Sequence, residues 1–528
     1  MKSLIDDLYA SKHTRMETDL YAYNPTAMEW PSKWLTAAIL IHGLLGGFGE
    51  VIDLVLMRMN IPLAAFYNQS MELHYDINLN DAGVTQLTSW IANLGQVGSV
   101  VAVILVVPRM DTWGRKTVAV YFRSAIGAIS ALMMIASKSF VSVELFALSQ
   151  LFIGFIRPLR IGVNKMYMSE CAPDHLRGFA TQSVSTGTML IMVLGGLTTT
   201  PQVFGNDDLW YMIGVVALGM IIIYVTAASF LPDSPKFMSY TGMDKKKVGK
   251  VIRKYHGKDA DIPVVLHSYT EEFHLTTHHH LGFREAWNDL GLRDSLYIVF
   301  VAALVPAIGP TQIFFVYAIP LKLRYGFTLG SANAFDFIAG MIMFPLAFAL
   351  PYLYERIGRK PLFILSLALS FAGITLMLVA QLVFVAQGHQ ASVWTVIFAG
   401  LFTIVVGLSN GLGSLVFYII LAADLLPASA KASTTTAALL VNFLAGIVMN
   451  FYYATFEPII GGTVLLPIIL AQAFFLIYEY RNLPETRLRP VADNFEVVRS
   501  RAVSRRHSLL PSQFDSNVSL LKGYGTTE

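Results

Sequence analysis

The sequence predicts an all-α membrane protein whose twelve transmembrane helices form two six-helix bundles. Three observations support this fold class: an apolar composition, twelve apolar runs long enough to cross a bilayer, and short motifs that recur in both halves of the chain. Of the 528 residues, 55% are hydrophobic and only 14% are charged. This composition excludes an ordinary water-soluble protein.

The apolar runs have the length that a membrane-spanning helix requires, because about 20 residues are needed to cross the hydrocarbon core. They lie near 34–57, 84–107, 117–137, 143–168, 178–200, 210–231, 296–318, 332–354, 361–386, 394–424, 432–455 and 463–480. Since twelve is an even number, both termini are expected on the same side of the membrane.

The distribution of Lys and Arg indicates which side that is, because short cytoplasmic loops concentrate these residues. Basic clusters follow the second and eighth runs, and the segment 244–258 contains seven Lys and Arg residues. We therefore expect a multi-pass protein of the cell membrane with both termini in the cytoplasm. The first loop on the opposite side contains the sequon NQS at Asn68, which predicts a glycoprotein.

The resulting organisation has five segments. They are a cytoplasmic N-terminal tail (1–32), an N-terminal six-helix bundle (33–231), a cytoplasmic linker (232–294), a C-terminal six-helix bundle (295–481) and a cytoplasmic C-terminal tail (482–528).

Short motifs recur at matching places in the two halves. DTWGRK at 111–116 follows the second run, and ERIGRK at 355–360 follows the eighth. After the fourth helix of each half, an acid is followed seven residues later by a base, and each half ends on a Leu-Pro-acid sequence. These pairs are Glu170 with Arg177, Asp424 with Lys431, and LPDSPK at 231–236 with LPETR at 483–487.

These motifs resemble those of the sugar porter family of the major facilitator superfamily, which includes facilitative glucose transporters and proton-sugar symporters. The resemblance also includes MYMSECAPDHLRG at 166–178, and it extends from the first helix to the twelfth. It implies the major facilitator fold, transport by alternating access, and a few short helices in the 232–294 linker.

The charged motif residues are expected to act as a gate at the cytoplasmic helix ends. They are Asp111, Arg115, Glu170 and Arg177 in the first half and Glu355, Arg359, Asp424 and Lys431 in the second. Charge-assisted pairs among them would hold the bundles together on this side and break when it opens. The alternative is that they only set the topology of the chain.

The substrate is expected at the bilayer midplane, where Gly and Pro interrupt the helices. The family carries Q-Q-x-S-G-x-N in its seventh helix, whereas this chain, aligned on Gly309, has V-P-A-I-G-P-T, and the fifth-helix glutamine is replaced by Ser185. Candidate substrate-binding residues are Asn442, Gln312, Tyr317, Phe314, Arg157, Arg160 and Ser185. With so many amides absent, the predicted substrate is a small polar organic solute, either a carbohydrate or an organic anion.

Charges within the first and fourth helices leave three interpretations open. Glu50 and Asp53 lie three residues apart and are candidates for proton coupling, whereas the positions of the coupling acid and base in the family hold Val51 and Gln150. Arg157 and Arg160 could pair with these acids, attract an anionic substrate, or bond helix carbonyls that Pro158 frees. Arg157 is expected about 10 Å deeper than the family arginine, so contact with Glu50 would strain both side chains.

Other signals are weaker. The single cysteine, Cys171, excludes an internal disulfide and a cysteine-based metal cluster, and the histidines at 278–280 are expected to be solvated. RRHS at 505–508 makes Ser508 a candidate phosphorylation site. No set of residues suggests an enzyme, a cofactor, a metal or a nucleic-acid partner. The expected partners are the solute, protons if transport is coupled, and the lipid bilayer, with no signal for an oligomeric state.

A non-transporting nutrient sensor on the same fold is the remaining alternative. The charged motifs at the helix ends of both halves favour a transporter, because a static sensor needs no reversible clamp.

Overall fold

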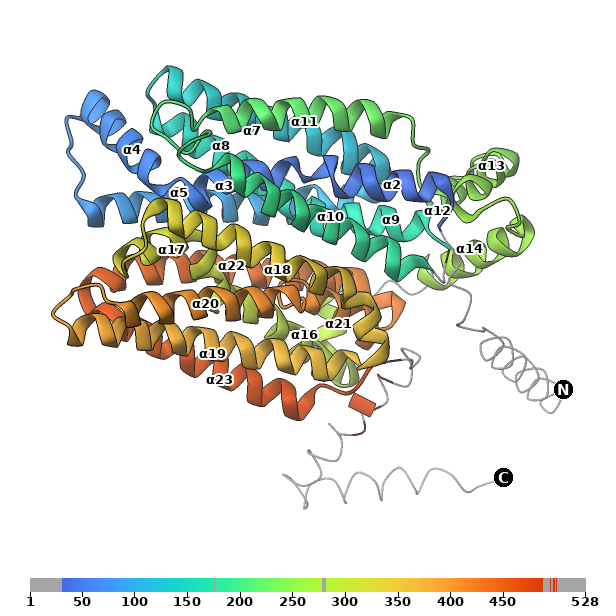
Figure 1. Ribbon diagram of the computed structural model, residues 1–528. Helices are drawn as coiled ribbons and strands as arrows, with labels where there is room; N and C mark the ends of the chain where they lie inside the picture. Colours follow the sequence, from blue (N-terminus) through green and yellow to red (C-terminus); the bar gives the residue numbers. More distant parts are fainter. Residues whose placement is uncertain are drawn as a thin grey trace, which may run out of the picture.

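The computed structural model describes residues 31–173, 176–277 and 282–487, together with 494, 497, 498 and 500. Within these ranges the chain is helical, and its long helices form two bundles that lie side by side (Figure 1). Short helices of the linker lie at one end of the bundles, which we call the linker end; the other is the far end. The N-terminal tail to residue 30, the histidines at 278–280 and Ser508 lie outside the described residues.

The first bundle contains the helices before the linker. They are α2 (Lys33–Gly43), η1 (Leu45–Gly47), α3 (Phe48–Arg58), α4 (Asn60–Tyr75), α5 (Asp81–Leu105), η2 (Val107–Arg109), α6 (Met110–Trp113), η3 (Thr117–Phe122), α7 (Arg123–Ser139), α8 (Val143–Pro158), η4 (Leu159–Asn164), α9 (Lys165–Cys171), α10 (Arg177–Thr198) and α11 (Met212–Ser229). The linker adds α12 (Pro235–Tyr240), α13 (Lys245–His256), α14 (Ile262–Thr277) and α15 (Phe283–Asn288).

The second bundle follows the linker. Its helices are α16 (Leu290–Ala307), α17 (Pro310–Arg324), α18 (Leu329–Arg356), α19 (Arg359–Ala386), α20 (Val393–Gly411), α21 (Phe417–Leu425), α22 (Ala428–Ile460), η6 (Gly461–Val464) and α23 (Leu465–Asn482).

Among the described residues, helix length and apolarity identify eleven of the twelve expected membrane passes. Ten helical stretches among the described residues are long and apolar enough to cross a membrane, and one of them, Ala430–Asn482, contains both α22 and α23. The remaining pass is α10. It contacts the second bundle, because the hydroxyl of Thr186 donates to the carbonyl of Ala347 in α18 at 3.3 Å. The short helices expected in the linker are present as α12 to α15.

Several passes among the described residues change helix type or break, and four of them occupy corresponding places in the two halves. The first pass breaks at η1, the fourth changes to the π-helical segment η4, the seventh breaks between α16 and α17, and the tenth breaks between α20 and α21. Each of these four segments contains or adjoins glycine or proline, the residues expected to interrupt helices near the bilayer midplane. Irregular backbone at membrane depth is tolerated where it is buried in protein or lines a cavity, so these breaks indicate segments that face the interior of the protein rather than lipid.

A close glycine contact sets the position of α8 against α5. A Cβ atom on Gly154 would lie 2.0 Å from the carbonyl oxygen of Gly95, and one on Gly98 would lie 2.1 Å from that of Leu151. Small residues of this kind allow membrane helices to approach closely. The hydroxyl of Ser99 also donates to the carbonyl of Gly154 at 2.9 Å. The fourth pass, which carries Arg157, is thereby fixed against the second.

We expect Gly154→Ala to lower the melting temperature of the purified protein by several degrees. The added methyl group forces α5 and α8 apart, and overpacking of this kind costs about 1–3 kcal/mol. The measurement is thermal unfolding in detergent, followed by intrinsic fluorescence.

The matched control is Gly219→Ala in α11, where a Cβ would meet nothing within 4 Å. Alanine has the higher helix propensity, so this variant should unfold at the same temperature as the wild type or above it. Equal melting temperatures in the two variants would contradict the proposed role of the contact.

Candidate functional site

Two ion pairs join the first pass to the fourth. Arg157, at the end of α8, donates from Nη2 to Oδ1 of Asp53 at 2.8 Å and from Nε to Oδ2 at 3.4 Å. Arg160, in η4, pairs with Glu50, which lies one turn before Asp53 on α3. All four side chains are largely buried. The π-helical geometry of η4 is of a kind that often marks functional sites.

This geometry favours the first of the three interpretations that the sequence leaves open, in which the arginines pair with the acids of the first pass. Both arginines meet carboxylates, Arg157 with Asp53 and Arg160 with Glu50. The strained contact between Glu50 and Arg157 is avoided, because each acid pairs with the arginine at its own depth. As a result, the four charges balance within the site.

Gly95 of α5 makes room for the Asp53–Arg157 pair. A Cβ at this position would lie 3.1 Å from Nη1 of Arg157. The α5–α8 glycine contact therefore both fixes the fourth pass and leaves space for its arginine. No charge pattern in the sequence could have indicated this role of Gly95.

A network of amides crosses the interface between the bundles. Gln312 of α17 donates to Asn450 of α22 at 2.9 Å, and Asn450 donates to Asn93 of α5 at 3.0 Å. The hydroxyl of Ser89, also on α5, donates to the backbone carbonyl of Asn450 at 3.0 Å. Gln312 was predicted to bind substrate, whereas Asn93 and Asn450 were missed. The signal that could have found them is a lone amide within an apolar run, because such a group is costly unless it is hydrogen-bonded.

Two other predicted residues use their polar groups within the protein. Asn442 of α22 donates to the backbone carbonyl of Ala303 in α16 at 2.8 Å. The hydroxyl of Ser185 donates to the carbonyl of Thr181, one turn earlier on α10, at 3.4 Å. These bonds account for both groups structurally, and substrate binding by them stays a prediction.

The predicted aromatic residues of α17 pack against the second bundle. Tyr317 lies 4.7 Å from Tyr453 between ring centroids, and Phe314 meets Phe402 edge-on at 6.4 Å. Phe314 also lies beside the ammonium group of Lys322. These contacts place apolar ring surface on the same helix as Gln312.

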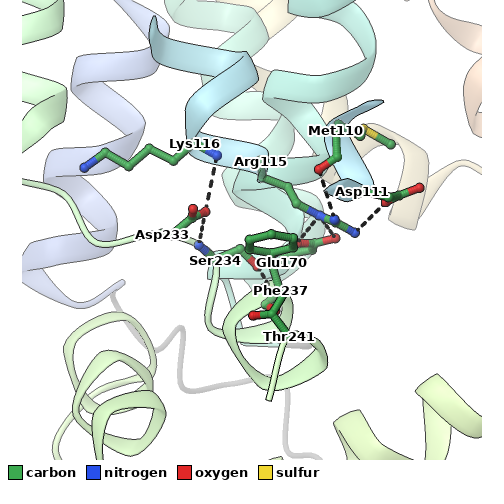
Figure 2. Close-up of polar contacts among 9 residues, drawn as sticks. All are labelled: Met110, Asp111, Arg115, Lys116, Glu170, Asp233, Ser234, Phe237 and Thr241. Carbon is green, nitrogen blue, oxygen red and sulfur yellow. Dashed lines mark hydrogen bonds and ion pairs between the residues drawn. The ribbon is translucent and has the colours of Figure 1, made fainter. Parts of the chain in front are cut away.

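A cluster of charged motif residues lies at the linker end of the first bundle (Figure 2). Nε of Arg115 donates to both carboxylate oxygens of Glu170 at 3.1 and 3.2 Å, and its Nη2 lies 3.0 Å from Asp111. The guanidinium carbon is 5.0 Å from the ring centre of Phe237, and the hydroxyl of Ser234 donates to Glu170 at 2.6 Å. The sequence predicted the first three residues, but not that α12 would close the cluster.

Asp233 fastens the linker to the DTWGRK loop. Its carboxylate accepts hydrogen bonds from the backbone N–H groups of Lys116 at 3.2 Å and Ser234 at 2.7 Å. The ammonium group of Lys116 donates to the carbonyls of Ser229 and Leu231, at 2.9 and 2.6 Å. Burial raises the pKa of Asp233, although its backbone hydrogen bonds oppose this shift. This carboxyl group therefore takes up a proton at a higher pH than a free aspartate.

The second half repeats this arrangement. Glu485 accepts hydrogen bonds from the backbone N–H groups of Arg359 at 3.0 Å and Lys360 at 3.3 Å. Arg359 pairs with Asp424, which also accepts from the hydroxyl of Thr486 at 3.1 Å. Both motif loops need a glycine, because the backbone angle φ is +96° at Gly114 and +114° at Gly358.

The described pairs therefore connect motif residues within each bundle. Arg177 opens α10, Lys431 lies in the first turn of α22, and the side chain of Glu355 lies outside the described residues. A clamp that joins the two bundles through these residues stays a prediction.

A buried ion pair lies in the far half of the second bundle. Lys322 of α17 pairs with Asp336 of α18, and their side chains are 2% and 6% exposed. Nearby, the amide of Asn60 in α4 donates to the carbonyl of Val316 in α17 at 3.5 Å, which connects the bundles. In the sequence, Lys322 follows the seventh apolar run, on the side of the membrane expected to have few cations.

The paired bundles, the interrupted helices and the ion pairs buried within each bundle are those of a secondary transporter with the major facilitator fold. Residues 47–494 match the family model "Sugar (and other) transporter", and the chain belongs to this family. It is thus a multi-pass membrane protein that transports a small polar solute, not an enzyme, and the predicted fold class and family resemblance are confirmed. The family relation also favours transport over the sensor alternative.

Named relatives are similar over most of their length. The chain is 22% identical over 442 residues to facilitated glucose transporter member 1 of solute carrier family 2 from Gallus gallus, covering 82% of this chain and 87% of the relative. It is 24% identical over 489 residues to facilitated glucose transporter member 9 of the same family from Homo sapiens, and the alignment covers 90% of this chain and 87% of that relative.

Solved structures show the same fold. The proton:xylose symporter XylE bound to 6-bromo-6-deoxy-D-glucose superimposes with a TM-score of 0.66 at 16% sequence identity, covering 88% of this chain and 99% of XylE. The inward-open conformation of XylE from E. coli gives a TM-score of 0.65 at 14% identity, covering 88% and 98%.

We expect Glu170→Gln to destabilise the protein much more than Asp111→Asn. The Glu170 side chain is 10% exposed and that of Asp111 is 65% exposed, although both pair with Arg115. Removing one member of a buried pair costs about 3–5 kcal/mol, whereas an exposed pair contributes about 1 kcal/mol or less. Melting temperatures of the two variants, measured in the same detergent, test this difference. A larger loss in Asp111→Asn would contradict it.

Proposed function

We propose that the protein transports a small neutral carbohydrate across the membrane together with protons. The observation that carries this proposal is the pair of ion pairs, Glu50–Arg160 and Asp53–Arg157, between the first and fourth passes. The named relatives include facilitated glucose transporters and a proton:xylose symporter, which supports both parts of the proposal.

Charge balance favours a neutral substrate over an organic anion. Each guanidinium group already has a carboxylate partner, so neither arginine offers free positive charge to an incoming anion. An anionic substrate would have to displace Glu50 or Asp53 and leave that carboxylate buried without a partner, which costs several kcal/mol. A carbohydrate requires no such displacement.

Proton coupling follows from what protonation does to such a pair. A protonated carboxyl group at Asp53 or Glu50 loses most of its attraction to the arginine, so proton uptake and the separation of α3 from α8 and η4 favour each other. A conformational change that separates these helices would in turn raise the affinity for protons.

The amide network supplies groups that suit sugar hydroxyls. Gln312, Asn450 and Asn93 each carry both a donor and an acceptor, and they lie where the two bundles meet. A sugar hydroxyl can both donate and accept, so it can replace an amide partner without leaving a group unpaired. Major facilitator transporters bind their substrates at such an interface.

The orientation we propose places the linker end in the cytoplasm of a cell and the far end outside. The seven basic residues of 244–258 lie at the linker end, in agreement with the distribution expected of a cytoplasmic segment. Asn68 lies on α4, which follows the far end of α3; its Oδ1 accepts from the backbone of Leu79 at 3.0 Å, which leaves its nitrogen free for a glycan. Both termini, with the tails 1–32 and 482–528, would then be cytoplasmic.

Reconstituted protein should accumulate D-xylose or D-glucose when the side of entry is acidic. We expect Glu50→Gln and Asp53→Asn to abolish this accumulation but to retain sugar exchange at equal pH, because only the proton-sensitive group is removed. Uptake of labelled sugars into proteoliposomes, with and without a pH gradient, measures both properties.

Asp208→Asn is the matched control, because this acid is exposed in the loop before α11, and accumulation should be unchanged. Unaltered proton-driven accumulation in both Glu50→Gln and Asp53→Asn would refute the coupling role. Uptake of an organic anion but of no sugar from the same panel would refute the substrate class.

Asn450→Ala and Gln312→Ala should raise the KM for the transported sugar by between about twofold and tenfold, because one neutral hydrogen bond contributes about 0.5–1.5 kcal/mol. Initial rates of uptake at varied sugar concentration give this value. Gln387→Ala, which removes an exposed amide after α19, should leave KM unchanged. An unchanged KM in both interface variants would exclude the network from the substrate site.

A further inference from the structure

Helix α13 has an amphipathic sequence, KKKVGKVIRKYH, whose two faces meet different surroundings. Its apolar side chains, Val248, Val251, Ile252 and Tyr255, are buried. The basic side chains of the helix and of the residue pair after it are all exposed: Lys245, Lys246, Lys247, Lys250, Arg253, Lys254 and Lys258. The cations therefore form one solvent-facing surface.

The apolar face of α13 is fixed within the protein. Val251 and Tyr255 belong to a cluster of buried side chains that includes Leu35 at the start of the first pass, and Val248 and Ile252 pack with Tyr269 of α14. Because these contacts hold the helix in place, its basic face keeps a constant orientation to the membrane-spanning helices.

Contacts to the beginning of the first pass place one end of α13 at the membrane boundary. The hydroxyl of Ser32 donates to the backbone carbonyls of Lys254 and Tyr255, both at 2.8 Å. The ammonium group of Lys254 lies 4.2 Å from the ring centre of Trp34, which is 38% exposed in the first turn of α2. Tryptophan is enriched at the level of lipid headgroups, so Lys254 lies at that level.

The spacing of the basic residues extends this surface along the helix. Lys247, Lys250 and Lys254 are separated by three and four residues, which places them on one face. Three acids lie near these cations: Asp244 and Asp261, which cap helices, and the exposed Asp259. Since the seven basic residues outnumber them, the surface keeps an excess of positive charge.

Helix α13 lies away from the interface between the bundles. Figure 1 shows it beyond the linker end of the first bundle and farther from the second bundle than α14. A basic helix beside the interface would act on the solute, whereas one in this place is free to meet the membrane surface.

We propose that the Lys247–Lys250–Lys254 face binds the phosphorylated headgroups of anionic membrane lipids, phosphoinositides above all. Clusters of four to eight basic residues next to a membrane-spanning helix are attracted to such headgroups. A headgroup with several phosphates can contact all three ammonium groups at once, whereas a lipid with a single negative charge contacts fewer of them. The site is independent of the transported solute and of the proton-coupled ion pairs.

The test uses the full-length protein in a neutral detergent and measures fluorescence anisotropy with labelled phosphatidylinositol 4,5-bisphosphate or labelled phosphatidylcholine. The test variant is Lys247→Gln/Lys250→Gln/Lys254→Gln. The matched control, Arg284→Gln/Arg356→Gln/Arg481→Gln, removes the same charge from exposed residues near the same end of the molecule. A third variant replaces the three lysines with arginine, which keeps the charge.

We expect the test variant to bind the phosphoinositide about tenfold more weakly than the wild type or worse. The control and the arginine variant should stay within about twofold, and phosphatidylcholine should not bind. Equal affinity in the test variant, or the same loss in the control, would overturn the proposal. Soluble inositol 1,4,5-trisphosphate should compete only at much higher concentration, and equal competition would overturn a membrane lipid as the ligand.

Discussion

The pairing of charges between the first and fourth passes is the constraint on which the transport site depends. An unpaired charge at the bilayer centre costs at least ~2.5–3.5 kcal/mol, and four charged side chains lie together between these two passes. Glu50 and Asp53 on α3 meet Arg160 and Arg157 on the facing pass. This match requires α8 to lie close to α5, which the glycines at the α5–α8 contact allow.

Much of the architecture could be predicted from the sequence, because apolar length and glycine or proline interruptions act locally. The choice of partner within the site could not. Helix rise predicted Arg157 too far toward the linker end for Glu50, yet Arg157 pairs with Asp53, which lies one turn nearer the far end than Glu50. It also gave no reason to pair Arg160 with Glu50. That pairing depends on the π-helical turn of η4 and on the separation of the helices, which packing determines.

Residues without charge were harder to find than residues with charge. Asn93 and Asn450 lie in apolar runs and match no motif, yet they connect Gln312 to the opposite bundle. Conversely, Asn442 and Ser185 aligned with family positions but donate to helix carbonyls. A side chain of this kind takes its role from what it faces, and the sequence of one helix does not specify its neighbours.

The bonds made by Asp233 and Glu485 have a mechanical consequence. Each ties the chain leaving the last helix of its half back to the loop after the second helix. These hydrogen bonds hold the helix ends of each half together at the linker end, and they oppose the separation of helices within that half. Movement during a transport cycle is then directed to the interface between the halves, where the neutral amides of Gln312, Asn450 and Asn93 have to part.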